Sequence, residues 1–237
     1  MQPVRIPLPP DELMVAVVGH SNHDDFDRSR LSGPSQMLKD LEAAVIDSTR
    51  LVDVLDFGCG CGRFLAGWVM LGSHFNLHGC DYNPALVQWC NEAVPGVRVQ
   101  RNQMGEALPY AANSFDLIYV VSVFTHLTLA EQRRLVSEFH RTLRPEGYIY
   151  LTFHGEHYYP TMCSTIGRRR RFKRDGFLIA GEQREGTNDC WTLHSVDNLV
   201  GLFDGFVPVK HFESIRRGPT DVAAWQDSLI FRNKQKT

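Results

Sequence analysis

The sequence predicts an α/β fold built on a doubly wound, mostly parallel sheet. Short, nearly continuous apolar runs recur along the chain, which is typical of strands buried on both faces. Segments with apolar residues at helical spacing separate these runs, so predicted strands and helices alternate. The last two predicted strands have only a loop between them, which indicates an antiparallel final strand.

The first half of the chain contains three predicted strands and three predicted helices. Each strand is a short apolar run, and each helix repeats apolar residues every three or four positions. Pro84 suits the first turn of a helix, where no N–H is needed. The polar, proline-containing first thirty residues are expected to be irregular. We predict helices at 35–47, at 62–71 and from Pro84, and strands at 51–57, 76–81 and 97–101.

The second half begins with a clear helix start. Thr128 and Glu131 have the spacing of a capping box, before a helix with one apolar face. The sequence RPEG (144–147) predicts a turn. Residues 155–190 are polar and glycine-rich, and they interrupt the alternation as an insert. We predict strands at 115–123, 148–153, 207–212 and 228–232, and a helix at 195–203.

Composition limits the domain organisation and the partners. A chain of 237 residues suits one large α/β domain; we expect an N-terminal cap segment at 1–34 and the main domain at 35–237. The net charge of -2 gives no global reason to expect nucleic acid or a membrane as partner. No apolar run reaches the roughly 18 residues of a membrane helix. Six cysteines without a CxxC pair favour reduced thiols and a cytoplasmic protein.

The stretch VLDFGCGCGR (54–63) follows the first predicted strand directly and opens a helix. Ligands of open α/β sheets bind at this end of the strands, and glycines let a ligand lie against the backbone. Cys59 and Cys61 raise the alternative of a thiol or metal site. Because CxC offers at most two ligands and a structural zinc needs four, no metal site is expected.

Asp81 in LHGCDYNP ends the second predicted strand, 25 residues after Asp56. An acidic residue about 20 residues beyond a glycine loop typically binds ribose hydroxyls. Asp81 would also serve as a helix cap for the segment that begins at Pro84. Taken with Asp56 and the glycines, it predicts a nucleoside site.

Four segments in order, VLDFGCGCGR, LHGCDYNP, ALPYAANSFDLIYVVSVFTHL and LRPEGYIYLTFHG, resemble the core motifs of class I S-adenosylmethionine (SAM) dependent methyltransferases. The resemblance covers about residues 35–155. It implies a Rossmann-like seven-stranded sheet with helices on both faces and an antiparallel last strand. It also implies SAM as cofactor, S-adenosylhomocysteine as product, and a small-molecule acceptor.

The resemblance further implies roles for individual residues. Asp81 would bind the ribose hydroxyls and Tyr82 would pack on the adenine. Gln103 stands where the family usually has an acidic residue on the adenine amino group, and an amide still accepts that hydrogen bond. The other expected contacts are Asp56, Gly58, Cys59, Gly60 and, on weaker grounds, Arg63 for the methionine end, Met104 beside Gln103, and Ser122 and Phe124 after the fourth strand.

Three histidines follow the fourth and fifth strands: His126, His154 and His157, with Glu156 between the last two. A histidine suits general-base work near neutral pH, which a hydroxyl or ammonium acceptor requires. For any one of them taken alone, a loop or helix-start histidine without chemistry is the more common case. As a group they favour a hydroxyl acceptor, such as a sugar or a natural-product intermediate.

The run RRRRFKR (168–174) contains six cations and an aromatic residue. It would suit RNA, a phosphate-bearing substrate or an acidic surface, or it is a solvated loop. The second enzyme hypothesis is therefore an RNA or protein methyltransferase that uses this loop, although SVFT replaces the NPPY-type tetrapeptide of base-amino methylases. A third hypothesis is a SAM-binding sensor or partner subunit without turnover. We favour the small-molecule enzyme and do not expect nucleic acid.

Overall fold

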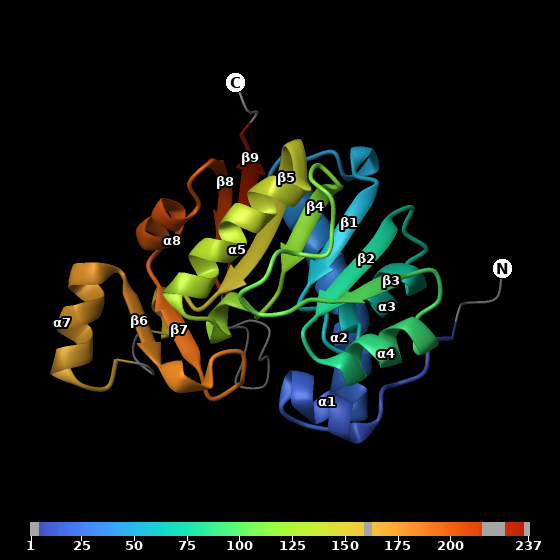
Figure 1. The fold of residues 1–237 in the computed structure, drawn as a ribbon, viewed down its shortest axis with the longest axis horizontal. Coiled ribbons are helices and arrows are strands. Elements are labelled where there is room, and N and C mark those ends of the chain that lie inside the picture. Colours follow the sequence, from blue (N-terminus) through green and yellow to red (C-terminus); the bar gives the residue numbers. More distant parts are fainter. Residues whose placement is uncertain (1–4, 159–162, 215–225, 235–237) are drawn as a thin grey trace. The chain divides into compact units, whose positions relative to one another are not determined.

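The computed structural model describes residues 5–158, 163–214 and 226–234 (Figure 1). The main sheet has seven strands in the order β3-β2-β1-β4-β5-β9-β8, and a second sheet pairs β6 with β7. The predicted α/β class is confirmed. The chain divides into two compact units, Met1–Tyr119 and Val120–Thr237, which are described separately below.

The first unit is a parallel αβ arrangement. β1 pairs in parallel with both β2 and β4, and β2 pairs in parallel with β3. Most predicted boundaries hold within two residues, because apolar runs and caps define them locally. The elements are α1 (Asp11–Val18), α2 (His23–Ala43), η1 (Ser48–Arg50), β1 (Asp53–Phe57), α3 (Arg63–Met70), β2 (Asn76–Asp81), α4 (Pro84–Ala93), β3 (Arg98–Arg101) and β4 (Phe115–Val120).

The prediction that the first thirty residues are irregular was wrong. α1 and α2 occupy most of them, and Asn22 caps α2 by accepting the N–H of Asp25. α2 is largely polar, so apolar spacing does not reveal its first turns; it is held by packing. A Cβ at Gly67 of α3 would lie 1.8 Å from the Arg30 carbonyl of α2, so this glycine lets the two helices approach closely. α2 also runs across residue 34, the expected end of the cap segment.

The second unit contains the rest of the main sheet and the small second sheet. β9 is antiparallel to β5 and to β8, which confirms the predicted orientation of the last strand. Its elements are η2 (Phe124–His126), α5 (Leu129–Thr142), β5 (Leu143–Phe153), η3 (Glu156–Tyr158), α7 (Ile166–Asp175), β6 (Phe177–Ala180), η4 (Glu182–Arg184), β7 (Trp191–His194), α8 (Val196–Leu202), β8 (Phe206–Phe212) and β9 (Asp227–Asn233).

The start of α5 shows half of the predicted capping box. The Thr128 hydroxyl accepts the N–H of Glu131 as expected. The Glu131 carboxylate instead pairs with Arg134 at 2.6 Å, and Glu185 accepts the Thr128 N–H at 2.6 Å. A residue distant in sequence has therefore taken over the reciprocal bond of the box.

Two other expectations change in the second unit. The residues of RPEG, expected as a turn, lie within β5, where Glu146 has a left-handed φ of 64°. The insert was expected only to interrupt the alternation, but its described residues contain regular structure: α7 lies beside β6, and β6 pairs with β7 (Figure 1). Phe172, Leu178 and Leu193 form its small apolar core together with Cys163. An insert core of this kind is assembled by tertiary contacts, which the polar sequence does not reveal.

Candidate functional site

The glycine loop turns sharply at the carboxyl end of β1. Gly58, Gly60 and Gly62 all have left-handed φ values, of 71°, 56° and 74°. The loop is tied to β2: the N–H groups of Gly58 and Cys59 donate to the Cys80 carbonyl at 2.8 and 3.0 Å. The loop therefore requires glycine for its backbone shape, which agrees with the prediction from sequence.

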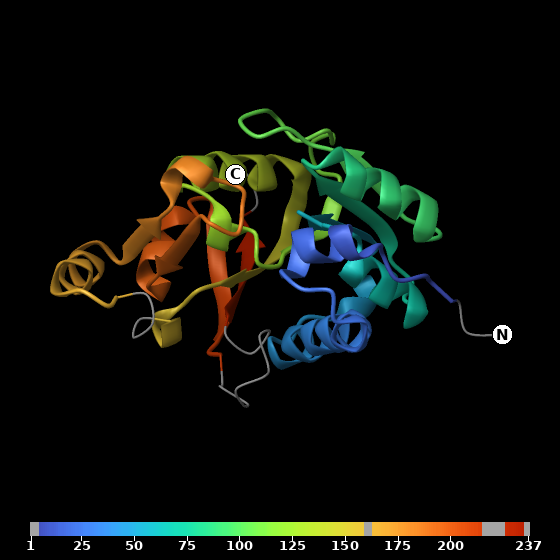
Figure 2. The same ribbon diagram turned by 90° about the horizontal axis from the view of Figure 1, so that it is seen from below.

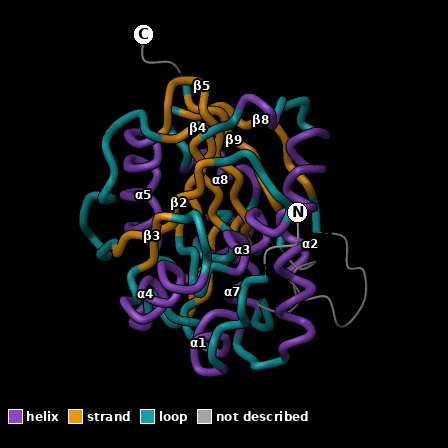
Figure 3. The backbone as a smooth tube through the Cα atoms, turned by 90° about the vertical axis from the view of Figure 1, so that its right-hand side faces the viewer, coloured by secondary structure: helices purple, strands orange, loops and turns teal. Residues whose placement is uncertain are grey.

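Helix α1 packs against this loop. A Cβ added at Gly60 would lie 2.9 Å from both Cγ atoms of Val17. Met14 of α1 belongs to the same apolar cluster as Cys61, Phe26 of α2 and Leu86 of α4. Figures 2 and 3 show α1 between α2 and α4. The N-terminal segment thus covers the glycine loop, a point that the sequence left open.

The cysteines of the loop are packing residues. Cys59 and Cys61 are 6% and 3% exposed. Burial raises the pKa of Cys61 to about 12, and a hydrogen bond with Cys90, followed by burial, raises the pKa of Cys59. Both thiols stay protonated at neutral pH, unlike metal-binding or nucleophilic thiolates. Within the described ranges, no group of three or more His, Cys, Asp or Glu side chains is placed to hold a metal ion.

Asp81 joins the glycine loop to the end of β2. One carboxylate oxygen accepts the N–H of Gly60 and the other accepts the N–H of Asn83, both at 2.9 Å. Burial raises the pKa of Asp81, although these backbone hydrogen bonds act in the opposite direction. A carboxylate oxygen accepts more than one hydrogen bond, so the remaining lone pairs are available to a ribose diol.

The Asp56 side chain is more deeply buried than is usual for a residue that contacts a ligand at the protein surface. It is 4% exposed, and burial raises its pKa to about 8, opposed by the Tyr119 hydroxyl and the Arg63 guanidinium. The half-buried Arg63 lies over the Phe64 ring at 5.0 Å. A cationic group brought beside Asp56 would favour its ionised form.

The end of β3 presents an acceptor that the sequence analysis missed. The side-chain oxygen of Asn102 is buried and has no hydrogen-bond partner, and the Asn102 N–H donates to the Asp81 carbonyl at 3.1 Å. The predicted contacts Gln103 and Met104 are exposed, and Tyr82 is 45% exposed. An orphaned buried acceptor next to Asp81 fits the amino group of a purine. The residues of this unit therefore fit a nucleoside.

In the second unit, the segment after β4 is held in a strained conformation. Ser122 has a φ of 59°, which is uncommon for a residue other than glycine. Its N–H donates to Thr152 Oγ1 at 2.8 Å, and its hydroxyl donates to Gln226 Oε1 at 2.9 Å. Phe124 is fully buried and packs on Phe139. Its side chain is part of the core, so only its backbone is left for a ligand contact.

Thr152 and Gln226 were not identified from the sequence. Thr152 could have been recognised as a polar residue within an otherwise apolar, buried part of β5. Gln226, which precedes β9, carried no local signal.

Backbone carbonyls of Thr192 in β7 and of Cys190, directly before this strand, orient two of the predicted histidines. His126 Nδ1 lies 2.7 Å from the Cys190 carbonyl, and His154 Nδ1 lies 3.0 Å from the Thr192 carbonyl. β6 occupies the other edge of β7. Because a carbonyl only accepts, each Nδ1 carries a proton, and in the neutral ring Nε2 is then the acceptor.

The electrostatics keep both rings neutral at physiological pH. Burial lowers the pKa of His154 to about 4 and also lowers the pKa of His126. The His154 ring lies 4.1 Å from the ring of Tyr158. Glu156 and His157 are exposed on η3. The structure thus brings His126 and His154 to one strand edge and leaves the other two candidates at the surface.

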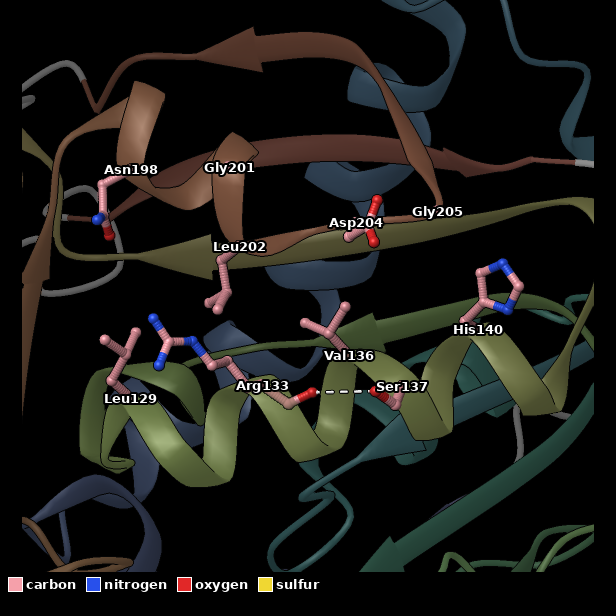
Figure 4. A pocket seen from close by; sticks show the side chains of 10 residues that line it. All are labelled: Leu129, Arg133, Val136, Ser137, His140, Asn198, Gly201, Leu202, Asp204 and Gly205. Carbon is pink, nitrogen blue, oxygen red and sulfur yellow. Dashed lines mark hydrogen bonds between the residues drawn. The ribbon is translucent and has the colours of Figure 1, made fainter.

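A cavity of the second unit involves none of the predicted site residues. It has a volume of about 790 Å³ and lies between α5 and α8. Figure 4 shows Val136 of α5 and Leu202 of α8 pointing toward each other, with Arg133, His140 and Asp204 at its margins. The Ser137 hydroxyl in its lining donates to the Arg133 carbonyl of the same helix at 3.4 Å.

Comparison with known proteins identifies methyltransferases as the proteins that this chain resembles. A family model described as a methyltransferase domain matches residues 55–151. A protein of Encephalitozoon cuniculi named as a methyltransferase is 29% identical over 172 residues, which are 69% of this chain and 74% of that protein. Phosphoethanolamine N-methyltransferase of Plasmodium falciparum is 29% identical over 103 residues, 42% of this chain and 38% of that enzyme. A solved SAM-dependent methyltransferase of Methanosarcina mazei shares the fold, with a TM-score of 0.53, 20% identity and coverage of 78% and 93%.

The glycine loop after β1, the carboxylate after β2 and the strand order define a Rossmann-like methyltransferase. The chain belongs to the class I SAM-dependent methyltransferases, and its cofactor is SAM. SAM supplies an activated methyl group for in-line displacement. Within the described ranges no helix is long and apolar enough to cross a membrane.

Proposed function

We propose that this methyltransferase acts on a small molecule and transfers the methyl group to an oxygen or nitrogen atom that must lose a proton. The name of the Plasmodium falciparum relative specifies a small amine, phosphoethanolamine, as its acceptor. A sugar or natural-product hydroxyl is the acceptor that the histidines favoured from the sequence. Six cysteines that all lie free and buried support a reducing compartment, and we place the enzyme in the cytoplasm.

The observation that carries the proposal is the pair of histidines held at the edge of β7. Each donates through Nδ1 to a backbone carbonyl, at 2.7 Å for His126 and 3.0 Å for His154. This arrangement leaves Nε2 of both rings as a proton acceptor. His126 is the more exposed of the two, so we assign it as the general base. His154 is 7% exposed, and we assign it to orienting the acceptor.

For the cofactor, we propose that Asp81 accepts the ribose hydroxyls and that Tyr82 packs on the adenine. We assign the adenine amino group to Asn102, with Gln103 and Met104 beside it. Asp56, Gly58, Cys59, Gly60 and Arg63 would hold the methionine end, and Ser122 and the Phe124 backbone would contribute from the segment after β4. The orphaned Asn102 oxygen and the Asp81 anchor support this assignment.

Bound SAM would supply the methyl group to the acceptor atom, and S-adenosylhomocysteine would leave as the product. Nε2 of His126 would take the proton that the acceptor atom loses. Holding the two reactants in line supplies roughly 7–11 kcal/mol of the barrier reduction. A positioned base adds about 10²- to 10⁴-fold.

The test begins with a screen of hydroxyl and amine acceptors for S-adenosylhomocysteine release. With the acceptor found, His126→Gln keeps an amide donor for the Cys190 carbonyl and removes the base. We expect kcat to fall at least about 100-fold, with SAM affinity unchanged by calorimetry. His154→Gln should mainly raise KM for the acceptor, and His157→Ala should have little effect.

Full activity in all three variants would show that catalysis proceeds by proximity alone, and a large loss only in His157→Ala would overturn the assignment to His126. If no small molecule is methylated while an RNA or protein is, the proposed acceptor class is wrong.

A further inference from the structure

Helix α7 carries the strongest concentration of positive charge in the described chain. Its sequence IGRRRRFKRD places six cations over ten residues, and all six are exposed. Asp175 forms a close pair with Arg174 at 2.6 Å and a longer one with Arg171 at 3.8 Å. α7 lies beside β6 at the margin of the second unit (Figure 1). The assigned methyltransferase site uses none of these residues.

The cations of α7 fall on two different sides of the helix. Arg168 and Arg171, three residues apart, share the side that carries Asp175, next to the buried Phe172. Arg170 and Lys173 share the solvent side. Arg168 and Arg171 line a cavity, and Arg170 and Lys173 do not contribute to its lining.

The cavity beside Arg168 and Arg171 has apolar and aromatic walls. Its volume is about 250 Å³, and Leu178, Ile179 and Trp191 line it from β6 and β7. The Arg168 guanidinium lies 5.6 Å from the centroid of the Trp191 ring. Trp191 therefore contacts Arg168 through a cation–π interaction and also lines the cavity.

We propose that this cleft binds a phosphorylated small molecule, with the phosphate between Arg168 and Arg171 and a planar or apolar portion against Trp191 and Ile179. The planar fork of arginine matches the oxygens of a phosphate, and two forks balance its two negative charges. The 3.8 Å distance of Arg171 from Asp175 is too long for a hydrogen bond, so Arg171 retains donors for a ligand.

The geometry favours a discrete ligand over an extended polyanion. A nucleic acid strand would engage cations along the open face of the helix, where Arg170 and Lys173 lie. The cavity walls instead enclose a volume of about 250 Å³ between the helix and the two strands. An apolar portion also gains from Trp191 and Ile179, whereas a simple anion gains from the charges alone. The ligand class is therefore an aryl or alkyl phosphate.

The test titrates phenyl phosphate into the full chain and follows binding by calorimetry. Inorganic phosphate and phenol, which each carry one of the two recognised groups, are titrated in the same way for comparison. We expect phenyl phosphate to bind more tightly than either of these two compounds. The double variant Arg168→Gln with Arg171→Gln should weaken it at least about 10-fold. Trp191→Leu should reduce the advantage of phenyl phosphate over inorganic phosphate.

The matched control is Arg170→Gln with Lys173→Gln, which removes the same charge from the solvent face of the same helix. It should change the affinity by less than about 2-fold. SAM binding and the thermal midpoint of each variant report correct folding. Equal weakening in both double variants, tighter binding of a short oligouridylate that the control abolishes, or no binding of phenyl phosphate would overturn the proposal. None of these outcomes depends on the methyl acceptor.

Discussion

Gly60→Ala is the most direct probe of how α1 and the glycine loop fit together. Gly60 has a φ of 56°, and a Cβ there would lie 2.9 Å from both Cγ atoms of Val17. The left-handed backbone costs an alanine roughly 1–2 kcal/mol. Crowding against Val17 adds about 1–3 kcal/mol, as is usual for an overpacked site. We therefore expect Gly60→Ala to lower the free energy of unfolding by about 2–5 kcal/mol.

A double-mutant cycle with Val17→Ala separates the two contributions. Val17→Ala removes both Cγ atoms, so in that background Gly60→Ala retains only its backbone cost. The coupling energy should be about 1–3 kcal/mol in the direction of rescue. Urea denaturation of the four proteins, with equal slopes, measures it. Calorimetry on the same proteins shows how far each change weakens SAM binding.

Gly72→Ala is the control for backbone strain alone. Gly72 has a φ of 66°, and a Cβ there would meet nothing within 4 Å. Its cost should be about 1–2 kcal/mol and independent of Val17. If Gly60→Ala and Val17→Ala are additive within about 0.5 kcal/mol, α1 does not pack on the loop and our reasoning fails.

Two further predictions concern Asn102 and His154. Asn102→Leu should raise the Kd for SAM about 10-fold by removing a buried acceptor, whereas Gln103→Leu should change it less than about 2-fold; the reverse result in calorimetry would restore Gln103 as the adenine contact. For His154 the folded pKa of about 4 lies below the unfolded value, so its stabilising effect is lost as pH falls from about 6.5 toward 4. Between about pH 7.5 and pH 5 this loss is about 2 kcal/mol. Urea denaturation at both pH values measures this loss of unfolding free energy. The loss should be about 2 kcal/mol smaller in His154→Gln than in the unmodified protein. An equal loss in the two proteins would contradict the burial of His154.

Local sequence was sufficient for much of the fold and for nominating part of the candidate site. Apolar runs and caps placed most strands and helices, because these signals act between residues a few positions apart. The glycine loop and Asp81 were nominated by their positions at the ends of two predicted strands. The carboxyl ends of neighbouring parallel strands meet at one edge of the sheet, so the two features were expected to lie close together. The spacing of Cys59 and Cys61 led us to expect no metal site there, and the structure adds that both side chains are buried.

The tertiary structure decided the features that depend on residues far apart in sequence. The helix predicted at 35–47 covers only the C-terminal part of α2, and its first turns were missed because packing on α3 stabilises a polar segment that apolar periodicity does not reveal. Asn102 became a candidate only when its oxygen proved buried and unpartnered. The proton positions on His126 and His154 follow from the carbonyls of Cys190 and Thr192, 64 and 38 residues further along the chain. A sequence shows which residue types are available for chemistry, whereas burial and hydrogen-bond partners, which set their protonation and orientation, arise only when the chain folds.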